Sequence, residues 1–387
     1  MFSYDYLILL SNILIVAVHA HSQSRPSLGI SSCSYVGAVH VDCGSENVSI
    51  PEIPNECTAI IFDGFNIDSN NQVNGPSGED NLLDELDLLL KSSKNVFILY
   101  GHETEEDWAQ VLATEISNNA TNSTNEMKGL KPFLDKHPGI KGLLINNLEL
   151  DANSVDFPKY SENFKVYLDT MRSNFSNMSI GLLLVGKFIV DQYTKPKLTW
   201  LNFTIIDPSV DFYMISVVTF NECTDQFRLL GTAPIGVLTS KNNTGSTNSS
   251  SNGSTNLTMP VTNYTLSNLR DILVDLSVPK NKTYYRYRLG PLSNDDTLDG
   301  MCASTVNKIC LNSTDSSSWC YETLDSFNAK GKFANDNGAG FVVNIIKLDD
   351  PKNDCKCGPY PSFNAILDGF NGKNTNITKE CALSNRS

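Results

Sequence analysis

The ten cysteines are the residues of this chain with the most distinctive chemistry, because cysteine either forms disulfides or ligates metal. Cys355 and Cys357 are separated by one residue, and Cys302, Cys310 and Cys320 precede them, so a zinc site is one interpretation. An oxidising compartment favours disulfides instead, and other features of the sequence predict export. We therefore expect disulfides that staple loops, with no metal and no cofactor.

Three internal histidines are the next candidates for catalysis, since histidine titrates near neutral pH. His40, His102 and His137 show neither metal-ligand spacing nor a cysteine or serine partner in a known motif. Structural or surface roles are therefore the favoured interpretation.

Tryptophan and arginine side chains could bind a ligand. Trp108, Trp200 and Trp319 either form stacking platforms for sugars or pack in the core, and Trp108 is a candidate for exposure near a cleft. Arg286 and Arg288 alternate with tyrosines in TYYRYRLG, as expected for a barrel strand with polar inward positions. They line the interior or a cleft, or form structural ion pairs.

Short apolar runs alternate with longer amphipathic stretches, which indicates an α/β fold. Several runs, such as FILY and GLLLV, are apolar at successive residues, as in parallel strands buried on both faces. The expected strands are Tyr35–Val41, Ala59–Phe65, Asn95–Tyr100, Gly142–Asn146, Ile180–Val185, Phe212–Phe220, Lys282–Leu289 and Phe341–Ile346.

Helical periodicity lies between these runs, at Asp80–Lys94, Thr265–Leu276 and Leu324–Asn335. Eight strands with intervening helices over this length favour a TIM (β/α)8 barrel, expected to occupy residues 21–387. Residues 241–258 read KNNTGSTNSSSNGSTNLT, which lacks periodicity and apolar residues, so we expect a disordered loop within the barrel domain.

The N-terminal segment predicts export. Tyr6–Ala20 is apolar, too short to span a bilayer, and ends in small residues, so residues 1–20 are interpreted as a signal peptide. The net charge of −14 and the pI near 4.8 disfavour nucleic acid and anionic membranes as partners. A neutral polysaccharide is compatible with this charge.

Asn-x-Ser/Thr sequons are dense, as expected for a secreted glycoprotein, although some are chance matches in an Asn-, Ser- and Thr-rich chain. The glycosylation candidates are Asn47, Asn119, Asn122, Asn174, Asn177, Asn202, Asn242, Asn248, Asn252, Asn256, Asn263, Asn281, Asn312, Asn376 and Asn385.

The chain resembles glycoside hydrolase family eighteen, the chitinases and chitinase-like lectins, over most of residues 33–370. The segment NGAGFVVNIIKLDDPKNDCKCGPYPSFNAI, residues 337–366, resembles the last barrel strand of that family and the helix after it. VDFYMISVVTFNEC resembles the sixth strand, ECTAIIFDGFNI the second and NVFILYGHE the third. The resemblance implies a TIM barrel with a reduced insertion between strands seven and eight, and a Cys33–Cys57 disulfide.

The resemblance implies that this chain lacks the acidic residues of the family's catalytic motif. The family's fourth strand carries Asp-Gly-x-Asp-x-Asp-x-Glu, whose Glu is the general acid in a substrate-assisted mechanism. The corresponding segment is KGLLINNLELD, and with Gly142 on the motif glycine its acidic positions become Lys141, Leu144, Asn146 and Leu148. Glu149 becomes an acid only through a one-residue slip, which turns a side chain to the opposite face unless a bulge intervenes.

The resemblance also implies a weakened sugar cleft. Phe220–Asn221 replaces the Tyr-Asp of the sixth strand, and Asn344 replaces the tryptophan that forms the floor of the sugar subsite. Candidate cleft residues are Asn146, Asn147, Phe220, Asn221, Asn344 and Trp108.

The sequence therefore predicts a secreted, non-catalytic chitinase-like glycoprotein. It would act by binding either a carbohydrate, such as an N-acetylglucosamine polymer, or a protein partner. One alternative is an active or weakly active hydrolase with Glu149 as a displaced acid. A second is a structural surface protein whose useful property is its glycan coat.

Overall fold

The computed structural model describes residues 25–36, 49–75, 82–113, 115–150, 157–195, 200–224, 227, 231–236, 264–293, 305–311, 319–375 and 378–383. The predicted signal peptide and the 241–258 loop lie outside these residues. So do the sequons at Asn47, Asn242, Asn248, Asn252, Asn256, Asn263, Asn312, Asn376 and Asn385.

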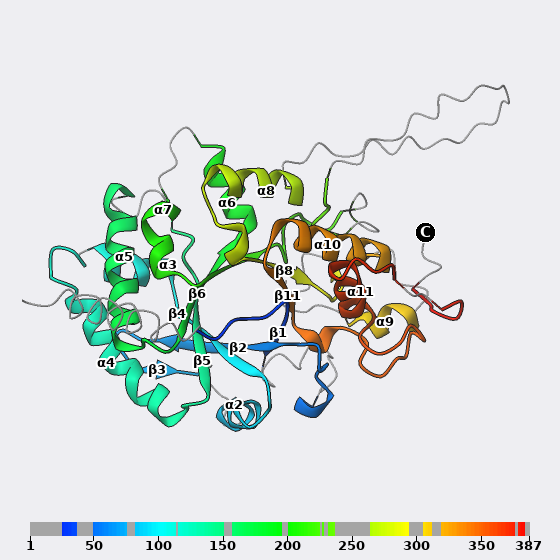
Figure 1. Ribbon diagram of the computed structural model, residues 1–387, viewed down its shortest axis with the longest axis horizontal. Helices are drawn as coiled ribbons and strands as arrows, with labels where there is room; N and C mark the ends of the chain where they lie inside the picture. The colour runs from blue at the N-terminus through cyan, green and yellow to red at the C-terminus, as the bar shows by residue number, and fades with distance from the viewer. Residues whose placement is uncertain are drawn as a thin grey trace, which may run out of the picture.

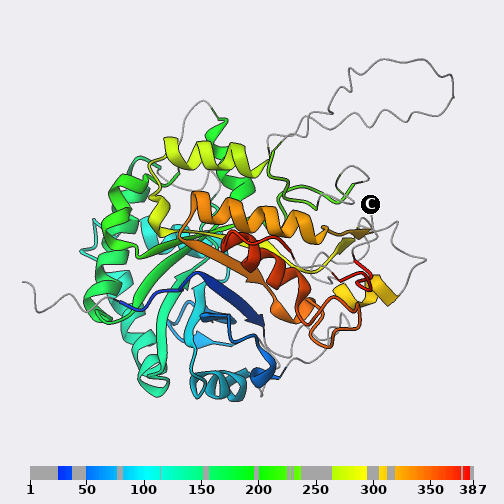
Figure 2. The same ribbon diagram turned by 45° about the vertical axis from the view of Figure 1, so that its right-hand side comes forward.

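Eight parallel strands of the described residues form a closed barrel, which confirms the predicted (β/α)8 fold. In spatial order they run β1-β11-β8-β7-β6-β5-β4-β2, and β1 pairs with both β2 and β11 to close the circle. Figures 1 and 2 show β1, in blue, beside β11, in orange. The strands are β1 (Ser31–Val36), β2 (Ala59–Ile67), β4 (Asn95–His102), β5 (Ile140–Ile145), β6 (Ser179–Val185), β7 (Phe212–Ser216), β8 (Thr283–Arg288) and β11 (Gly340–Asn344).

Helices connect successive strands and surround the barrel (Figure 1). They are α2 (Leu82–Leu90), α3 (Glu105–Ala113), α4 (Thr121–Lys136), α5 (Phe157–Asn174), α6 (Gly186–Tyr193), α7 (Phe203–Ile206), α8 (Leu266–Asp275), α10 (Leu324–Asn337) and α11 (Pro361–Phe370). The three helices expected from periodicity correspond to α2, α8 and α10, with ends shifted by a few residues.

The strands bury alternate residues in two different layers, because successive side chains point to opposite faces. One layer fills the barrel interior and includes Ile61, Leu99, Leu144, Met214 and Val342. The other, larger layer lies between the barrel and its helices and includes Ile60, Ile98, Ile145, Tyr213 and Val343. The runs of successive apolar residues in the sequence therefore reflect strands that are buried on both sides.

Two boundaries of the expected strands are corrected. The first strand begins at Ser31, not Tyr35, and two of its buried serines donate to backbone carbonyls: Ser31 Oγ to Glu56 and Ser32 Oγ to Leu28, the latter at 2.8 Å. The sixth barrel strand, β7, ends at Ser216, because the chain turns away before Phe220.

The segment between β8 and β11 consists of short elements. Within its described residues, β9 (Leu292–Ser293) pairs antiparallel with β10 (Trp319–Cys320), and α9 (Val306–Leu311) and α10 complete it. Helix α10 packs on α11 at two glycines, Gly331 and Gly369, where an added Cβ would collide with the backbone of the other helix. Figure 2 shows these two helices side by side.

Four disulfides join described cysteines: Cys33–Cys57, Cys223–Cys320, Cys310–Cys355 and Cys357–Cys381. The first is the pair that the family resemblance implies. The other three tie the region around β10, α9 and the C-terminal segment to the body of the barrel. Cys310, Cys320, Cys355 and Cys357, which were candidates for a zinc site, are therefore all bonded in disulfides. The described residues hold no cluster of metal-ligating side chains.

Candidate functional site

The carboxyl ends of the parallel strands form the mouth of the barrel, where functional residues of this fold lie. Strand alternation turns one polar residue from each of five strands toward the barrel axis: Asp63, Asn146, Ser216, Arg286 and Asn344. Each follows by two residues an apolar side chain of the interior layer. The mouth is therefore a polar cap on an apolar barrel core.

Arg286, on β8, is the central charge of this cap. Its Nη2 donates a hydrogen bond to Oδ1 of Asn344 on the neighbouring β11, and its Nε is buried without a hydrogen-bond partner. Burial lowers the pKa of Arg286, and the nearby carboxylate of Asp63 opposes that shift. The positive charge is thus held in a poorly solvated place.

Two further buried polar atoms of the interior lack a hydrogen-bond partner, Oγ of Ser34 and Oδ1 of Asn146. Asn146 lies against Gly101 of β4, where any Cβ would collide with the amide of Asn146. Only a glycine at this position allows Asn146 to point across the barrel. The mouth therefore contains several unpaired polar atoms, an arrangement more typical of a binding site than of a packed core.

The four residues at the positions of the family's carboxylates lie in different parts of the barrel. Leu144 is fully buried in the barrel interior, and Asn146 lies above it at the mouth. Leu148 is fully buried in the outer layer, between barrel and helices, so a carboxylate there would not face a ligand. Lys141 is near the start of β5, at the opposite end of the barrel.

Asn147 explains why Leu148 points outward. Its φ of 58° places it in the left-handed region, and its side-chain Nδ2 donates to the carbonyl of His102 at 2.9 Å. The chain therefore stops alternating as a strand after Asn146, and Leu148 turns into the helix layer. Asn147 itself is a half-buried loop residue.

Glu149 lies in the loop after β5, beside the carboxyl end of β6. Its Oε1 accepts a hydrogen bond from the backbone N–H of Val185 at 3.1 Å. Burial raises the pKa of Glu149, an effect opposed by the Val185 hydrogen bond, and Glu105 raises it further. Its negative charge also acts on Tyr160 of α5, so its surroundings belong partly to the outer helix layer.

Three other candidate cleft residues do not line the mouth, contrary to the prediction from the sequence. Trp108 is fully buried in the outer layer, where its Nε1 donates to the carbonyl of Asn146 at 2.9 Å. Phe220 is also fully buried, with its ring against Tyr264. The Nδ2 of Asn221 donates to the carbonyls of Thr232 and Tyr264, so this side chain fixes a loop. Asn146 and Asn344 are the candidates that lie at the mouth, at the ends of strands on opposite sides of the barrel.

Asp63 is one of the mouth residues that sequence reasoning missed, and Ser216 is another. It follows Phe62 in a run of apolar residues, and a local irregularity of the β2–β4 pairing occurs between Phe62 and Phe65. A charged residue on a strand that is otherwise buried was the available signal.

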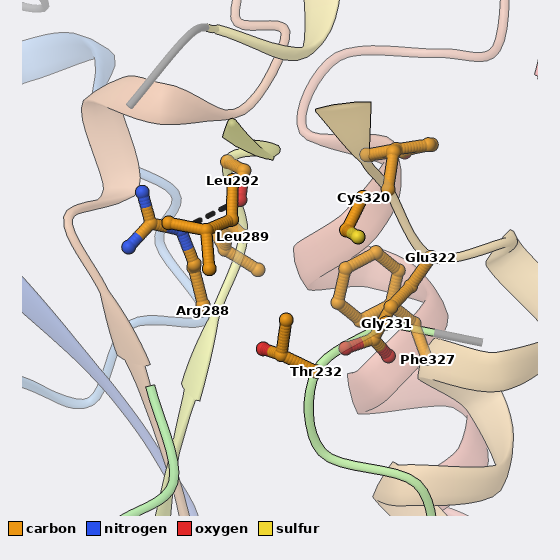
Figure 3. A pocket seen from close by; sticks show the side chains of 10 residues that line it. Gly231, Thr232, Arg288, Leu289, Leu292, Cys320, Glu322 and Phe327 are labelled. Carbon is orange, nitrogen blue, oxygen red and sulfur yellow. Dashed lines mark hydrogen bonds between the residues drawn. The ribbon is translucent and has the colours of Figure 1, made fainter. Parts of the chain in front are cut away.

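A small pocket lies beside the mouth, between the end of β8 and the β9–β10 pair. Figure 3 shows Arg288 on one side of it and Cys320, Glu322 and Phe327 on the other. Arg288 Nε donates to the carbonyl of Gly290 at 3.0 Å, and burial lowers the pKa of Arg288 to about 10. On the other side, Glu322 pairs with Lys330 beneath the surface.

Comparison with solved structures supports the same fold. The group IV chitinase of Ostrinia furnacalis in complex with allosamidin superposes with a TM-score of 0.65 at 14% identity, over 90% of this chain and 100% of that one. An immunomodulatory active chitinase from Trichuris suis superposes with a TM-score of 0.61 at 14% identity, over 88% of this chain and 100% of that one.

Human YKL-39, described as a pseudo-chitinase with retained chitooligosaccharide binding, superposes with a TM-score of 0.60 at 14% identity. The match covers 89% of this chain and 100% of that one. No family model and no curated protein matches the sequence. At these identities the similarity establishes a shared fold with chitinases and chitinase-like proteins, both active and inactive. Among the described residues, no helix is long and apolar enough to cross a membrane.

Proposed function

We propose that this chain is a secreted chitinase-like glycoprotein that binds a ligand at the barrel mouth without hydrolysing it. The observation that carries the proposal is the set of inward residues at the end of β5. Leu144 and Asn146 occupy positions where the resemblance implies acids, and Leu148 points away. A general acid that protonates the leaving group must lie in the cleft, within hydrogen-bond reach of the substrate.

Several observations support binding as the role of the mouth. Its unpaired polar atoms at Ser34, Asn146 and Arg286 offer hydrogen bonds to a ligand. YKL-39, which shares the fold, retains chitooligosaccharide binding as a pseudo-chitinase. We therefore favour a glycan as the ligand, with a protein partner at the upper loops as the second candidate.

Export is part of the proposal. Four disulfides among the described cysteines fit an oxidising compartment, where disulfides persist. The sequons and the apolar N-terminal segment also favour export.

A weak hydrolase that uses Glu149 is the competing proposal, and one observation favours it. Burial raises the pKa of Glu149, as a general acid requires. Against it, the Val185 N–H at the end of β6 already binds the carboxylate, and this hydrogen bond favours the ionised form. Burial alone accounts for the raised pKa and needs no catalytic role.

Hydrolysis of a fluorogenic chitotriose substrate separates these proposals. We expect no turnover above background from the purified protein, because loss of a general acid alone lowers rates by about two to four orders of magnitude. A Glu149→Gln variant should behave identically. Turnover by the wild type that disappears in Glu149→Gln would establish Glu149 as the acid and overturn the non-catalytic proposal.

Glycan occupancy is a second prediction, and the structure ranks the sequons. Asn177 and Asn281 are exposed, so a glycan at either extends into solvent. Asn122 is half-buried, and its Nδ2 donates to the carbonyl of Val111 at 3.1 Å. A glycan on that nitrogen would displace the hydrogen bond and crowd α3.

Glycopeptide mass spectrometry after enzymatic deglycosylation in heavy-oxygen water measures this occupancy site by site. We expect modification at Asn177 and Asn281 and none at Asn122. The opposite pattern would show that the packing around Asn122 differs from that described. Secreted protein from a eukaryotic host is the appropriate material.

A further inference from the structure

The guanidinium of Arg286 is incompletely paired. Asn344, its hydrogen-bond partner across the β8–β11 pair, is neutral, and Nε of Arg286 has no partner in the part of the chain that the structure describes. Asp63 is the acidic residue near enough to favour the charge of Arg286, yet no ion pair joins the two among the described residues. Buried charges in folded proteins are normally paired, because desolvation of an unpaired charge is costly.

Apart from Asp63, the polar neighbours of Arg286 at the mouth are neutral. The unpaired Oγ of Ser34 and Oδ1 of Asn146 are neutral, and Ser216 at the end of β7 is neutral too. Arg288 adds a second guanidinium on the same face of β8, about 6.6 Å farther toward the opening by strand geometry. Its hydrogen bonds go to the neutral carbonyls of Gly290 and Pro291. Among these residues the two guanidinium groups outnumber the single carboxylate of Asp63, so the mouth carries a local excess of positive charge in a protein whose net charge is −14.

We propose that the barrel mouth binds a carboxylate-bearing sugar, with its carboxylate on the guanidinium of Arg286. This inference rests on the proposed function, glycan binding at the mouth, and specifies the class of glycan. A planar carboxylate matches the fork of guanidinium donors and supplies the charge that Asn344 does not. The neutral amide and hydroxyl atoms of Asn146 and Ser34 are suited to the sugar hydroxyls.

The overall charge limits the size of the acidic ligand. A long polyanion would be repelled by a surface with a net charge of −14, whereas a short oligosaccharide places its charge only at the arginines. We therefore infer an acidic mono- or oligosaccharide, not an extended anionic polymer.

Isothermal titration with two tetrasaccharides of equal length tests the inference. One probe alternates N-acetylglucosamine with glucuronate, and the other is neutral chitotetraose. We expect the acidic probe to bind the full-length secreted protein at least tenfold more tightly. Raised salt should weaken only the acidic probe, since its binding includes a charge pair.

Asn344→Asp is the decisive variant. It changes one atom of a side chain that already accepts from Arg286, so the fold is retained and the arginine gains a carboxylate of its own. We expect a loss of at least tenfold in affinity for the acidic probe and less than a threefold change for chitotetraose. Arg286→Met should show the same selective loss. Arg270→Met, on the exposed face of α8, is the matched control and should change neither affinity.

The outcomes distinguish this inference from the function on which it rests. Binding of chitotetraose alone, or acidic-probe affinity unchanged in Asn344→Asp and Arg286→Met, would overturn the inference and leave glycan binding intact. Failure of both probes to bind would overturn the glycan proposal and the inference together.

Discussion

Replacement of Glu126 by leucine is expected to lower the free energy of unfolding by about 3–5 kcal/mol, because it breaks a buried hydrogen-bonded charge network. Glu126 lies on α4 and is fully buried. Its Oε1 accepts from the hydroxyls of Tyr100 and Tyr167, and its Oε2 lies 3.0 Å from Nε2 of His102. Leucine would leave three buried polar side chains without their acceptor.

The network joins three elements of the barrel wall, so the loss is not local. Tyr100 and His102 lie on β4 and Tyr167 on α5, while Trp108 of α3 packs its ring against His102 and Tyr167. Burial and the negative charge of Glu126 both raise the pKa of Tyr100 and of Tyr167, so both phenols are protonated and act as hydrogen-bond donors at neutral pH. Glu126 thus holds β4, α4 and α5 together.

Urea unfolding followed by tryptophan fluorescence measures the effect. Glu126→Gln, which keeps one acceptor oxygen, should be milder than Glu126→Leu. The control Glu106→Gln, on the exposed first turn of α3, should change stability by less than about 0.5 kcal/mol. A loss below about 1 kcal/mol in Glu126→Leu would contradict the role given to this network.

Replacement of Lys330 by methionine is the second large effect, also about 3–5 kcal/mol at neutral pH. Nζ of Lys330 pairs with Glu322, and the side chains are 1% and 8% exposed. Burial lowers the pKa of Lys330 and raises that of Glu322, while their mutual attraction opposes both shifts. Methionine would leave Glu322 as an unpaired buried carboxylate.

The loss of stability in Lys330→Met should increase with pH. Without Lys330, the pKa of Glu322 in the folded state rises further above its unfolded value. The folded variant then binds a proton that the unfolded chain releases, so its deficit is smallest at low pH and grows as pH rises through the folded pKa. Thermal or urea unfolding of both proteins at acidic and neutral pH measures this difference.

A double replacement provides the control. Lys330→Met together with Glu322→Leu removes both charges and should recover much of the stability lost by Lys330→Met alone, because apolar residues can replace a buried ion pair. A double variant as unstable as the sum of the two single variants would show that the pair is not coupled. The exposed pair of Lys131 and Asp135 should contribute less than about 1 kcal/mol in the same assay.

The strands of this barrel were predictable because most are buried on both faces. Runs such as Ile180–Val185 keep apolar residues at every position, which distinguishes them from helices and exposed strands. The first strand was placed four residues too late because Ser31, Ser32 and Ser34 are polar. The buried hydroxyls of Ser31 and Ser32 donate to the carbonyls of Glu56 and Leu28, partners that a hydrophobicity pattern does not reveal.

The site was predictable only where strand alternation continues. Strand alternation turns Leu144, on β5, and Asn146, directly after its end, toward the barrel axis. It does not hold for Leu148 and Glu149, because the left-handed conformation of Asn147 ends the alternation. A single backbone angle of this kind has no signal in composition or periodicity.

The aromatic candidates show a different limit. Trp108 lies on an amphipathic helix, and either face of such a helix can present a tryptophan to a ligand or to the core. Trp108 is buried in the core, where it donates to the Asn146 carbonyl and packs against the ring of His102. The alternation of Tyr and Arg on β8 was more informative, since period two placed Arg286 inward.

The pairing of β1 with β11 also has a consequence for biosynthesis. The first strand ends at Val36, whereas the strand that covers its open edge begins at Gly340. At a translation rate of about 5–20 residues per second, roughly 15–60 s separate the appearance of these two strands. During that interval the growing sheet exposes unpaired strand edges, which are templates for aggregation. Chains terminated before β11 should therefore be strong clients of chaperones and of degradation.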